Sequence, residues 1–95
     1  MAQLITWLES SWIGDMPPGA VHPWTAWGGI QPGDVFCIMA HPVVGNPNAP
    51  ERVLQVENVR AEGTPNGVRR IYYSVRNAGP DWITGYSKTY MMLRP

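Results

Sequence analysis

Hydrophobic and polar side chains alternate along several short stretches of the chain, most clearly between Arg70 and Arg76. There Ile71, Tyr73 and Val75 occupy every second position, and the positions between them are mostly polar or charged. Successive side chains of a β-strand point to opposite faces, so this period of two predicts a strand with one face in the core. A shift of one residue would bury both arginines, so the pattern specifies the register strongly.

Clusters of glycine and proline cut the rest of the chain into pieces of similar length. Ten glycines and ten prolines occur among the 95 residues, a density that argues against helices. The stretches between these clusters have the length and side-chain pattern of short strands. Six strands are therefore predicted, at residues 4–13, 20–27, 35–41, 51–61, 68–77 and 85–93.

Local signals add detail to four of these strands. The first stretch also shows helical spacing, and we favour a strand there. Proline cannot donate a ladder hydrogen bond, so Pro23 places the second stretch at a sheet edge. The third stretch, Val35 to His41, is apolar on both faces and is expected at the centre of a sheet, covered on both sides. Asn66 and Gly67 suit a turn with positive φ, which predicts a hairpin between the fourth and fifth stretches.

The order and spacing of these elements define the expected fold class. Six strands with short connections, and no segment long enough for a crossover helix, predict an all-β fold built as a small, mostly antiparallel β-sandwich. A small β-barrel is the alternative. Residues 1–95 are expected to form a single domain, because a chain of this length has room for one hydrophobic core.

Two short motifs resemble sequences of known families. The strand and loop Val75-Arg76-Asn77-Ala78-Gly79 resemble the V-x-N-x-G pattern of CARDB-like and related immunoglobulin-like bacterial modules. The stretch Pro17-Pro18-Gly19 with His22 and Trp24 resembles the PPG-x-x-H-x-W segment of small, Trp-rich, uncharacterised bacterial proteins. The first resemblance implies an immunoglobulin-like sandwich, and neither implies an activity.

The charge of the chain excludes some partners. Charged residues make up 15% of the chain, below the usual share, and seven basic residues balance seven acidic ones. We therefore expect no binding to nucleic acid and none to an anionic membrane. No stretch is apolar enough to span a membrane and no signal peptide is recognisable, so we expect a cytoplasmic protein or one released without such a signal.

The fifth predicted strand contains three arginines, for which two interpretations are possible. Arg69, Arg70 and Arg76 would form a basic stripe, with Tyr72 between Arg70 and Arg76. A stripe of this kind occurs in single-strand nucleic-acid platforms. We favour a solvated strand face that pairs with Glu57 or Glu62 across the hairpin.

The residues that catalysis would need do not occur in recognisable motifs. The chain has no nucleophile elbow, zinc-protease motif, phosphate-binding loop or calcium loop, so we expect no enzyme, no cofactor and no metal site. The single cysteine, Cys37, lies in an apolar run and is expected to be buried as a small hydrophobe. A small enzyme remains a third hypothesis, and it requires His22, His41, Asp34 and Asp81 to converge in space.

Tryptophan is the one unusual feature of the composition. The chain has five tryptophans, four of them within its first 27 residues. Trp7 and Trp24 are expected to fill the core, because a chain with a single phenylalanine needs other bulky side chains there. Trp12, Trp27 and Trp82 adjoin glycine- or proline-containing turns, where burial and exposure are both open.

These features support two binding hypotheses. The first is a non-catalytic module that forms a homo-oligomer or binds a protein partner, since aromatic, Met and Arg side chains are enriched at such interfaces. Its expected interface residues are Trp12, Tyr90, Met91, Met92 and Arg94. The alternative is a lectin-like carbohydrate-binding module in which a sugar ring stacks on an exposed indole. Its expected ligand-binding residues are Trp82, Tyr86, Asp81, Trp27 and Asn77.

Overall fold

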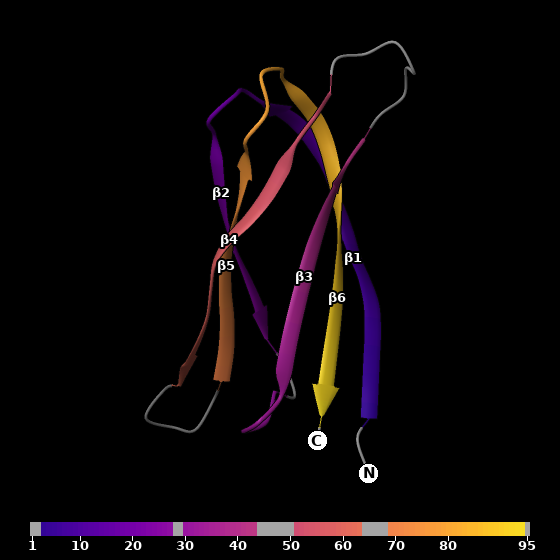
Figure 1. Ribbon diagram of the computed structural model, residues 1–95, viewed down its shortest axis with the longest axis vertical. Coiled ribbons are helices and arrows are strands. Elements are labelled where there is room, and N and C mark those ends of the chain that lie inside the picture. Colours follow the sequence, from indigo (N-terminus) through magenta and orange to yellow (C-terminus); the bar gives the residue numbers. More distant parts are fainter. Residues whose placement is uncertain (1–2, 28–29, 44–50, 64–68, 95) are drawn as a thin grey trace.

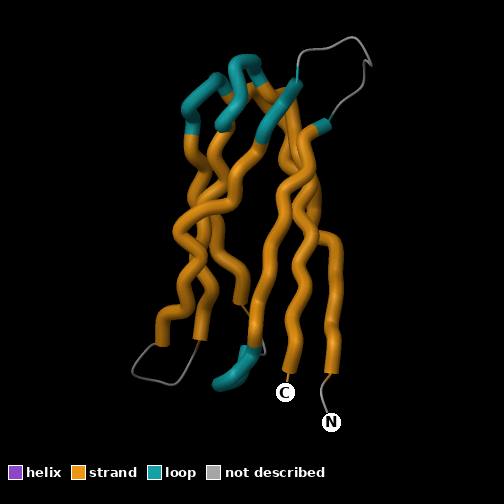
Figure 2. Tube along the Cα trace, viewed as in Figure 1, coloured by secondary structure: helices purple, strands orange, loops and turns teal. Residues whose placement is uncertain are grey.

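The structure is a computed structural model that describes residues 3–27, 30–43, 51–63 and 69–94, with the backbone alone for 7–11, 27 and 69. Six strands run through this part of the chain, which contains no helix (Figures 1 and 2). The strands are β1 (Gln3–Met16), β2 (Val21–Trp27), β3 (Val35–Pro42), β4 (Leu54–Gly63), β5 (Arg69–Asn77) and β6 (Ile83–Arg94). The first stretch is therefore a strand, as favoured.

The strands form two three-stranded sheets in two layers (Figure 1). One sheet has the order β1-β6-β3 and the other the order β2-β5-β4, and all pairs of neighbours are antiparallel. Only β4 and β5 are consecutive strands of one sheet, so every other connection passes from one layer to the other. The predicted small, mostly antiparallel β-sandwich is confirmed, and the sheets do not close into a barrel.

The core lies between the two central strands, β5 and β6. The inward positions Ile71, Tyr73 and Val75 of β5 are buried, as the alternation predicts. From β6, Tyr86 and Tyr90 fill the facing layer. Each central strand is covered by strands on both sides and by the opposite sheet on one face, so its inward side chains lose contact with water.

The prediction for the third stretch is wrong, because β3 lies at the edge of its sheet and β6 at the centre. Its side chains alternate between partly buried and exposed: Val35 is 54% exposed and Met39 61%. Cys37 is exposed as well, against the expected burial. A strand that is apolar on both faces has the same sequence pattern whether its second face is covered by protein or lies open.

The predictions for β2 and for the hairpin agree with the structure. Strand β2 is an edge strand, with Pro23 opposite Ser74 in the middle of its ladder. Strands β4 and β5 pair from Leu54↔Asn77 to Gly63↔Arg69, and the predicted turn at Asn66 and Gly67 lies outside the described residues. A bulge interrupts β4 between Glu57 and Arg60, where Asn58 has a φ of 56°. That positive φ is one that asparagine tolerates better than most residues.

Candidate functional site

The described residues predicted to bind a sugar divide between the interior and the surface. Asn77 is 1% exposed, and its amide Nδ2 donates to the carbonyl oxygens of Met16 (2.9 Å) and Asp81 (2.8 Å). Its Oδ1 accepts from the Gly79 amide at 3.1 Å. These bonds tie the β5–β6 turn to the end of β1, so the Asn77 side chain has a structural role. Trp82, for which burial and exposure were both open, is 52% exposed.

Tyr86, also predicted to bind a sugar, is buried at the centre of an aromatic cluster. Its hydroxyl accepts a hydrogen bond from Trp24 Nε1 at 2.8 Å and lies 2.9 Å from His22 Nδ1. An indole N–H only donates, so the Tyr86 oxygen is the acceptor from Trp24, while the donor in the contact with His22 depends on the imidazole tautomer. The Trp12 ring packs against this group, with its centroid 4.5 Å from that of His22. In this conformation Tyr86 holds the cluster together and cannot stack on a ligand.

Burial sets the charge state of this cluster. It lowers the pKa of His22 below the usual value of 6.5, because the desolvated imidazolium loses its hydration. Burial raises the pKa of Tyr86, and the hydrogen bond from Trp24 offsets part of that effect. Both groups are therefore neutral near pH 7.

Lys88 is the residue of this region that sequence reasoning missed. It is 3% exposed, and its Nζ lies 3.1 Å from the centroid of a Trp24 ring, in a cation–π contact. Position 88 lies two residues from both Tyr86 and Tyr90 on β6, so alternation places it on the inward face. The alternation along β6, which places Tyr86 and Tyr90 on the inward face, is the signal that could have identified this buried lysine.

The predicted interface residues divide between the interior and the surface. Tyr90 and Met92 point inward and are buried, and the Tyr90 hydroxyl shares a hydrogen bond with that of Tyr73. The Arg94 guanidinium donates to both carboxylate oxygens of Asp34, at 3.1 Å and 2.9 Å. Trp12 is half-buried against the core. The prediction that Tyr90 and Met92 contact a partner at the surface is therefore wrong, because both side chains are buried.

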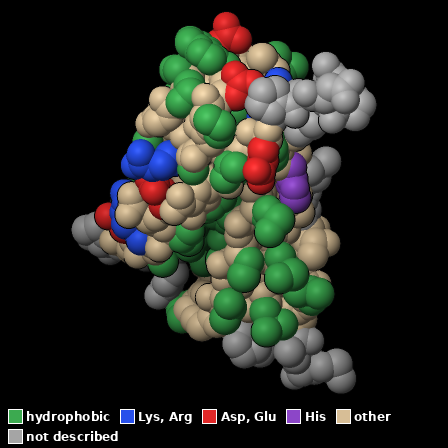
Figure 3. Space-filling view, turned by 45° about the horizontal axis from the view of Figure 1, so that its top comes forward, with side chains coloured by type: hydrophobic (Ala, Val, Ile, Leu, Met, Phe, Trp, Pro, Cys, Tyr) green, Lys and Arg blue, Asp and Glu red, His purple; other side chains and the backbone are tan. Residues whose placement is uncertain are grey.

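Met91, by contrast, lies on a continuous apolar surface, the outward face of the β1-β6-β3 sheet. We call this surface the outer face and define it by Leu4 and Thr6 of β1, Thr89, Met91 and Leu93 of β6, and Val35, Cys37, Met39 and His41 of β3. The register aligns these side chains in rows across the strands, such as Leu4, Leu93 and Val35. None of the nine is Lys, Arg, Asp or Glu, and Figure 3 shows hydrophobic side chains gathered without charged ones in its lower part.

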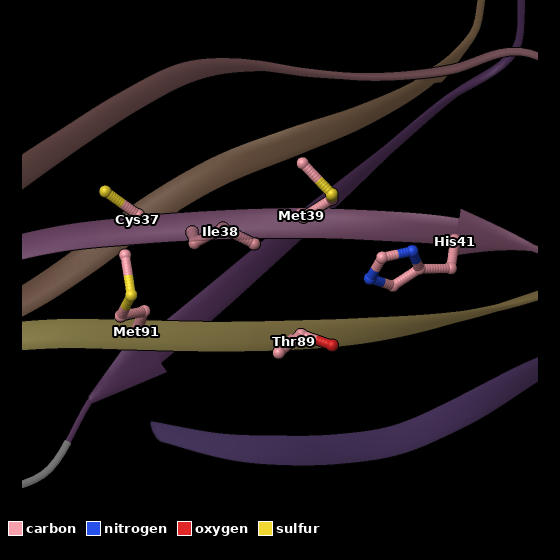
Figure 4. A pocket seen from close by; sticks show the side chains of 6 residues that line it. All are labelled: Cys37, Ile38, Met39, His41, Thr89 and Met91. Atoms are coloured by element: carbon pink, nitrogen blue, oxygen red, sulfur yellow. The ribbon is translucent and has the colours of Figure 1, made fainter. Parts of the chain in front are cut away.

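A shallow hollow of about 330 Å³ opens on the outer face. Its lining comes from both β3 and β6 (Figure 4). The six lining residues are Cys37, Ile38, Met39, His41, Thr89 and Met91. Three sulfur-containing residues and one histidine therefore line one small volume, and no Asp or Glu lines it.

The convergence required by the enzyme hypothesis does not occur. His22 belongs to the buried aromatic cluster, whereas His41 lies on the outer face. Asp34 pairs with Arg94 beyond the opposite end of β3, and the Asp81 carboxylate accepts the backbone N–H of Trp82 at 2.8 Å. Within residues 3–27, 30–43, 51–63 and 69–94, no group of three or more His, Cys, Asp or Glu side chains could hold a metal ion.

The outward face of the β2-β5-β4 sheet is polar, in line with the solvated strand face favoured for the arginines of β5. Arg76 and Glu57 form an ion pair across β5 and β4, with 3.0 Å between Nη2 and Oε1. The Arg60 guanidinium lies 5.2 Å from the centroid of the Tyr72 ring. The predicted pairing with Glu57 is confirmed for Arg76.

The side chains of Trp7 and Trp27 lie outside the described part of the structure, so the roles predicted for them in the core and in sugar binding stay predictions. Trp24, the other indole assigned to the core, packs against it and is partly buried. Among the described residues there is no helix with the length and hydropathy to span a membrane.

Comparison of the chain with protein-family models, with curated proteins and with solved structures finds no match. The immunoglobulin-like resemblance therefore stays a prediction, beyond the sandwich architecture itself. The outer face and the buried aromatic cluster are the two features on which a function can be based.

Proposed function

We propose that this domain is a non-catalytic, self-associating module whose copies meet along the edge of β3 and the adjoining outer face. The observation that carries the proposal is the lack of protection on β3. An exposed sheet edge presents unpaired backbone N–H and C=O groups to any other strand, and native edge strands usually carry a feature that blocks such pairing.

The other three edges each have a protecting feature. Strand β1 has register shifts between Glu9 and Trp12 and between Ile13 and Met16. Strand β2 has Pro23 in the middle of its ladder. Strand β4 combines a bulge with the charged residues Glu57, Arg60 and Glu62.

Strand β3 lacks all of these features. Its ladder with β6 runs from Val35↔Leu93 to Pro42↔Tyr86 without a register shift. Its single proline is the last residue of the strand, and it contains no Lys, Arg, Asp or Glu. A regular, uncharged and apolar edge of this kind favours pairing with another strand.

A second copy of the chain is the occupant that fits this edge. Two β3 strands related by a two-fold axis near Ile38 would pair antiparallel, Cys37 of each copy opposite Met39 of the other, and extend both outer faces into one uncharged surface. The contact involves a single eight-residue strand from each copy and leaves most of both outer faces open. It is therefore smaller than a standard interface of roughly 800 Å² per partner, and we expect weak association.

The test is the molar mass in solution as a function of concentration, by light scattering and sedimentation. The wild type should rise above the monomer mass of 10.6 kDa towards twice that value at high micromolar concentration. Val35→Lys places a charge on the β3 edge and should weaken association about tenfold or more. Val21→Lys is the matched control, because Val21 is an exposed valine on the edge strand of the other sheet. Equal association of the two variants would contradict the proposal.

Carbohydrate binding is the second candidate, and the exposure of Trp82 supports it. The indole is 52% exposed, next to the partly buried Asp81. Because Tyr86 and Asn77 are engaged in the interior, a sugar would have to be held by Trp82 and Asp81 with few other contacts. A glycan panel read by tryptophan emission, with Trp82→Ala for comparison, tests this candidate. A response that survives Trp82→Ala, or no response at all, would exclude this site.

A further inference from the structure

We propose that the hollow on the outer face binds one soft monovalent cation, Cu(I), through the sulfur atoms of Cys37, Met39 and Met91, with the imidazole of His41 as a further ligand. All four side chains line the same hollow. The proposal does not rest on self-association, because each of the four ligands comes from a single copy of the chain.

The register places the three sulfur-containing residues at neighbouring positions on one face of the sheet. Cys37 lies directly opposite Met91 on the neighbouring strand, so their Cα atoms are about 4.5 to 5.5 Å apart. Met39 follows two residues further along β3 on the same face, about 6.6 Å from Cys37. Methionine has three rotatable side-chain bonds, so the two thioethers can adjust to a common ion.

Figure 4 shows how the side chains are placed around the hollow. The Met91 side chain extends from β6 towards β3 near Cys37, and the His41 ring is turned back along β3 towards the middle of the hollow. Thr89 also lines the hollow and lies on β6, opposite Met39 of β3. The Cys37 and Met39 side chains extend from β3 on the side away from β6 in this view, so they would have to turn to reach an ion shared with Met91. The four residues come from two adjacent strands, whose ladder has no register shift along this stretch.

The chemistry of the donors selects the ion. Thiolate and thioether ligands are soft and favour Cu(I), whereas Mg²⁺ and Ca²⁺ require the oxygen ligands that this hollow lacks. On binding, the Cys37 thiol loses its proton to solvent and a bond forms between sulfur and metal. One thiolate and one monovalent cation have no net charge, which suits an uncharged surface, whereas Zn²⁺ would leave one positive charge there.

The experiment measures metal binding to the intact chain under anaerobic, reducing conditions. Ag(I) and Cu(I) are the probes, stoichiometry is counted by native mass spectrometry, and affinity is obtained by competition with a chromophoric chelator. The variants are Cys37→Ser, Met39→Leu and Met91→Leu. Met92→Leu is the matched control, because Met92 is adjacent in sequence but points into the core. Circular dichroism of each variant checks that the fold is retained.

We expect one Ag(I) or Cu(I) per chain, with Zn²⁺ bound much more weakly. Met39→Leu and Met91→Leu should each weaken Ag(I) and Cu(I) binding about tenfold, and Cys37→Ser more, with Met92→Leu equal to the wild type. Wild-type affinity in both Met39→Leu and Met91→Leu would overturn the proposal, because Cys37 alone would then account for the binding. A preference for Zn²⁺ over Ag(I) and Cu(I) would also overturn the proposal. Val35→Lys should weaken self-association and leave metal binding unchanged, so a failure of one proposal can be distinguished from a failure of the other.

Discussion

Both sheets of the sandwich contribute buried side chains to one core, but their outward faces are very different. Outside the β2-β5-β4 sheet, charged groups find partners on the neighbouring strand, as in the pair of Arg76 and Glu57 and the contact of Arg60 with Tyr72. Outside the β1-β6-β3 sheet, the outer face has no charged side chain and its apolar groups meet solvent, Met39 at 61% exposure. A face with its polar groups paired needs no partner, whereas an open apolar face is typical of an interaction surface.

The largest effect is expected where β5 contributes to the interior. Ile71→Ala removes buried carbons from the core, and we expect a loss of about 2 to 5 kcal/mol in the free energy of unfolding. Ser74→Ala, on the outward side of the same strand, is the matched control and should change it by less than about 0.5 kcal/mol. Chemical denaturation of both variants measures the difference. Similar losses would mean that the two faces of β5 are not distinct.

A smaller effect is expected in the buried aromatic cluster. Tyr86→Phe removes the hydroxyl that accepts from Trp24 Nε1 and interacts with His22 Nδ1. We expect destabilisation of about 1 to 3 kcal/mol, because polar groups of two side chains lose their partner. Thermal unfolding followed by near-ultraviolet circular dichroism measures this effect. An unchanged stability would show that the cluster is open enough for water to replace the hydroxyl.

The same cluster predicts a pH dependence of stability. Burial lowers the pKa of His22 in the folded state, so the unfolded chain takes up the proton first as the pH falls. The stabilisation from the neutral imidazole is complete above about pH 6.5 and is lost as the pH drops below that value, until the folded state is protonated too. The pairing of Asp34 with Arg94 lowers the pKa of that carboxyl below 3.8, so its contribution is lost only at lower pH.

Denaturant midpoints measured between pH 8 and pH 5 test the dependence on His22. The wild type should lose stability below about pH 6.5, and His22→Gln should show a flatter profile over this interval. Equal slopes for the two proteins would assign the pH dependence to other groups.

The smallest effect is expected on the polar outward face. Glu57→Gln breaks the ion pair with Arg76, and we expect a loss of about 0.2 to 1 kcal/mol that shrinks as salt is added. Self-association should not change, since this face lies on the other sheet. A change in molar mass in this variant would relocate the contact to the β2-β5-β4 sheet.

Particular residues explain what could be predicted from the sequence. The alternation of Ile71, Tyr73 and Val75 with polar positions allowed only one burial pattern, and the structure follows it. Pro23 marked an edge strand for the same reason that proline is rare at sheet centres. Each of these signals is local, so it was readable without knowledge of the partner strands.

The errors arose where a local pattern fits two environments. The run from Val35 to His41 is apolar on both faces, and only the sheet order shows that one face is open. Tyr86 and Asn77 had the chemistry of ligand-binding residues, but their partners, Trp24 and the Met16 carbonyl, come from distant parts of the chain. Contacts between residues about 60 positions apart become visible only in the assembled sheets.

Backbone hydrogen exchange at several protein concentrations tests the central claim most directly, because it reports on the β3 edge without any substitution. If copies pair along β3, exchange in a peptide covering residues 35–42 slows as the concentration rises from low to high micromolar, while exchange in residues 54–63 of the protected β4 edge stays the same. Exchange in residues 35–42 that is independent of concentration across this range would contradict the account.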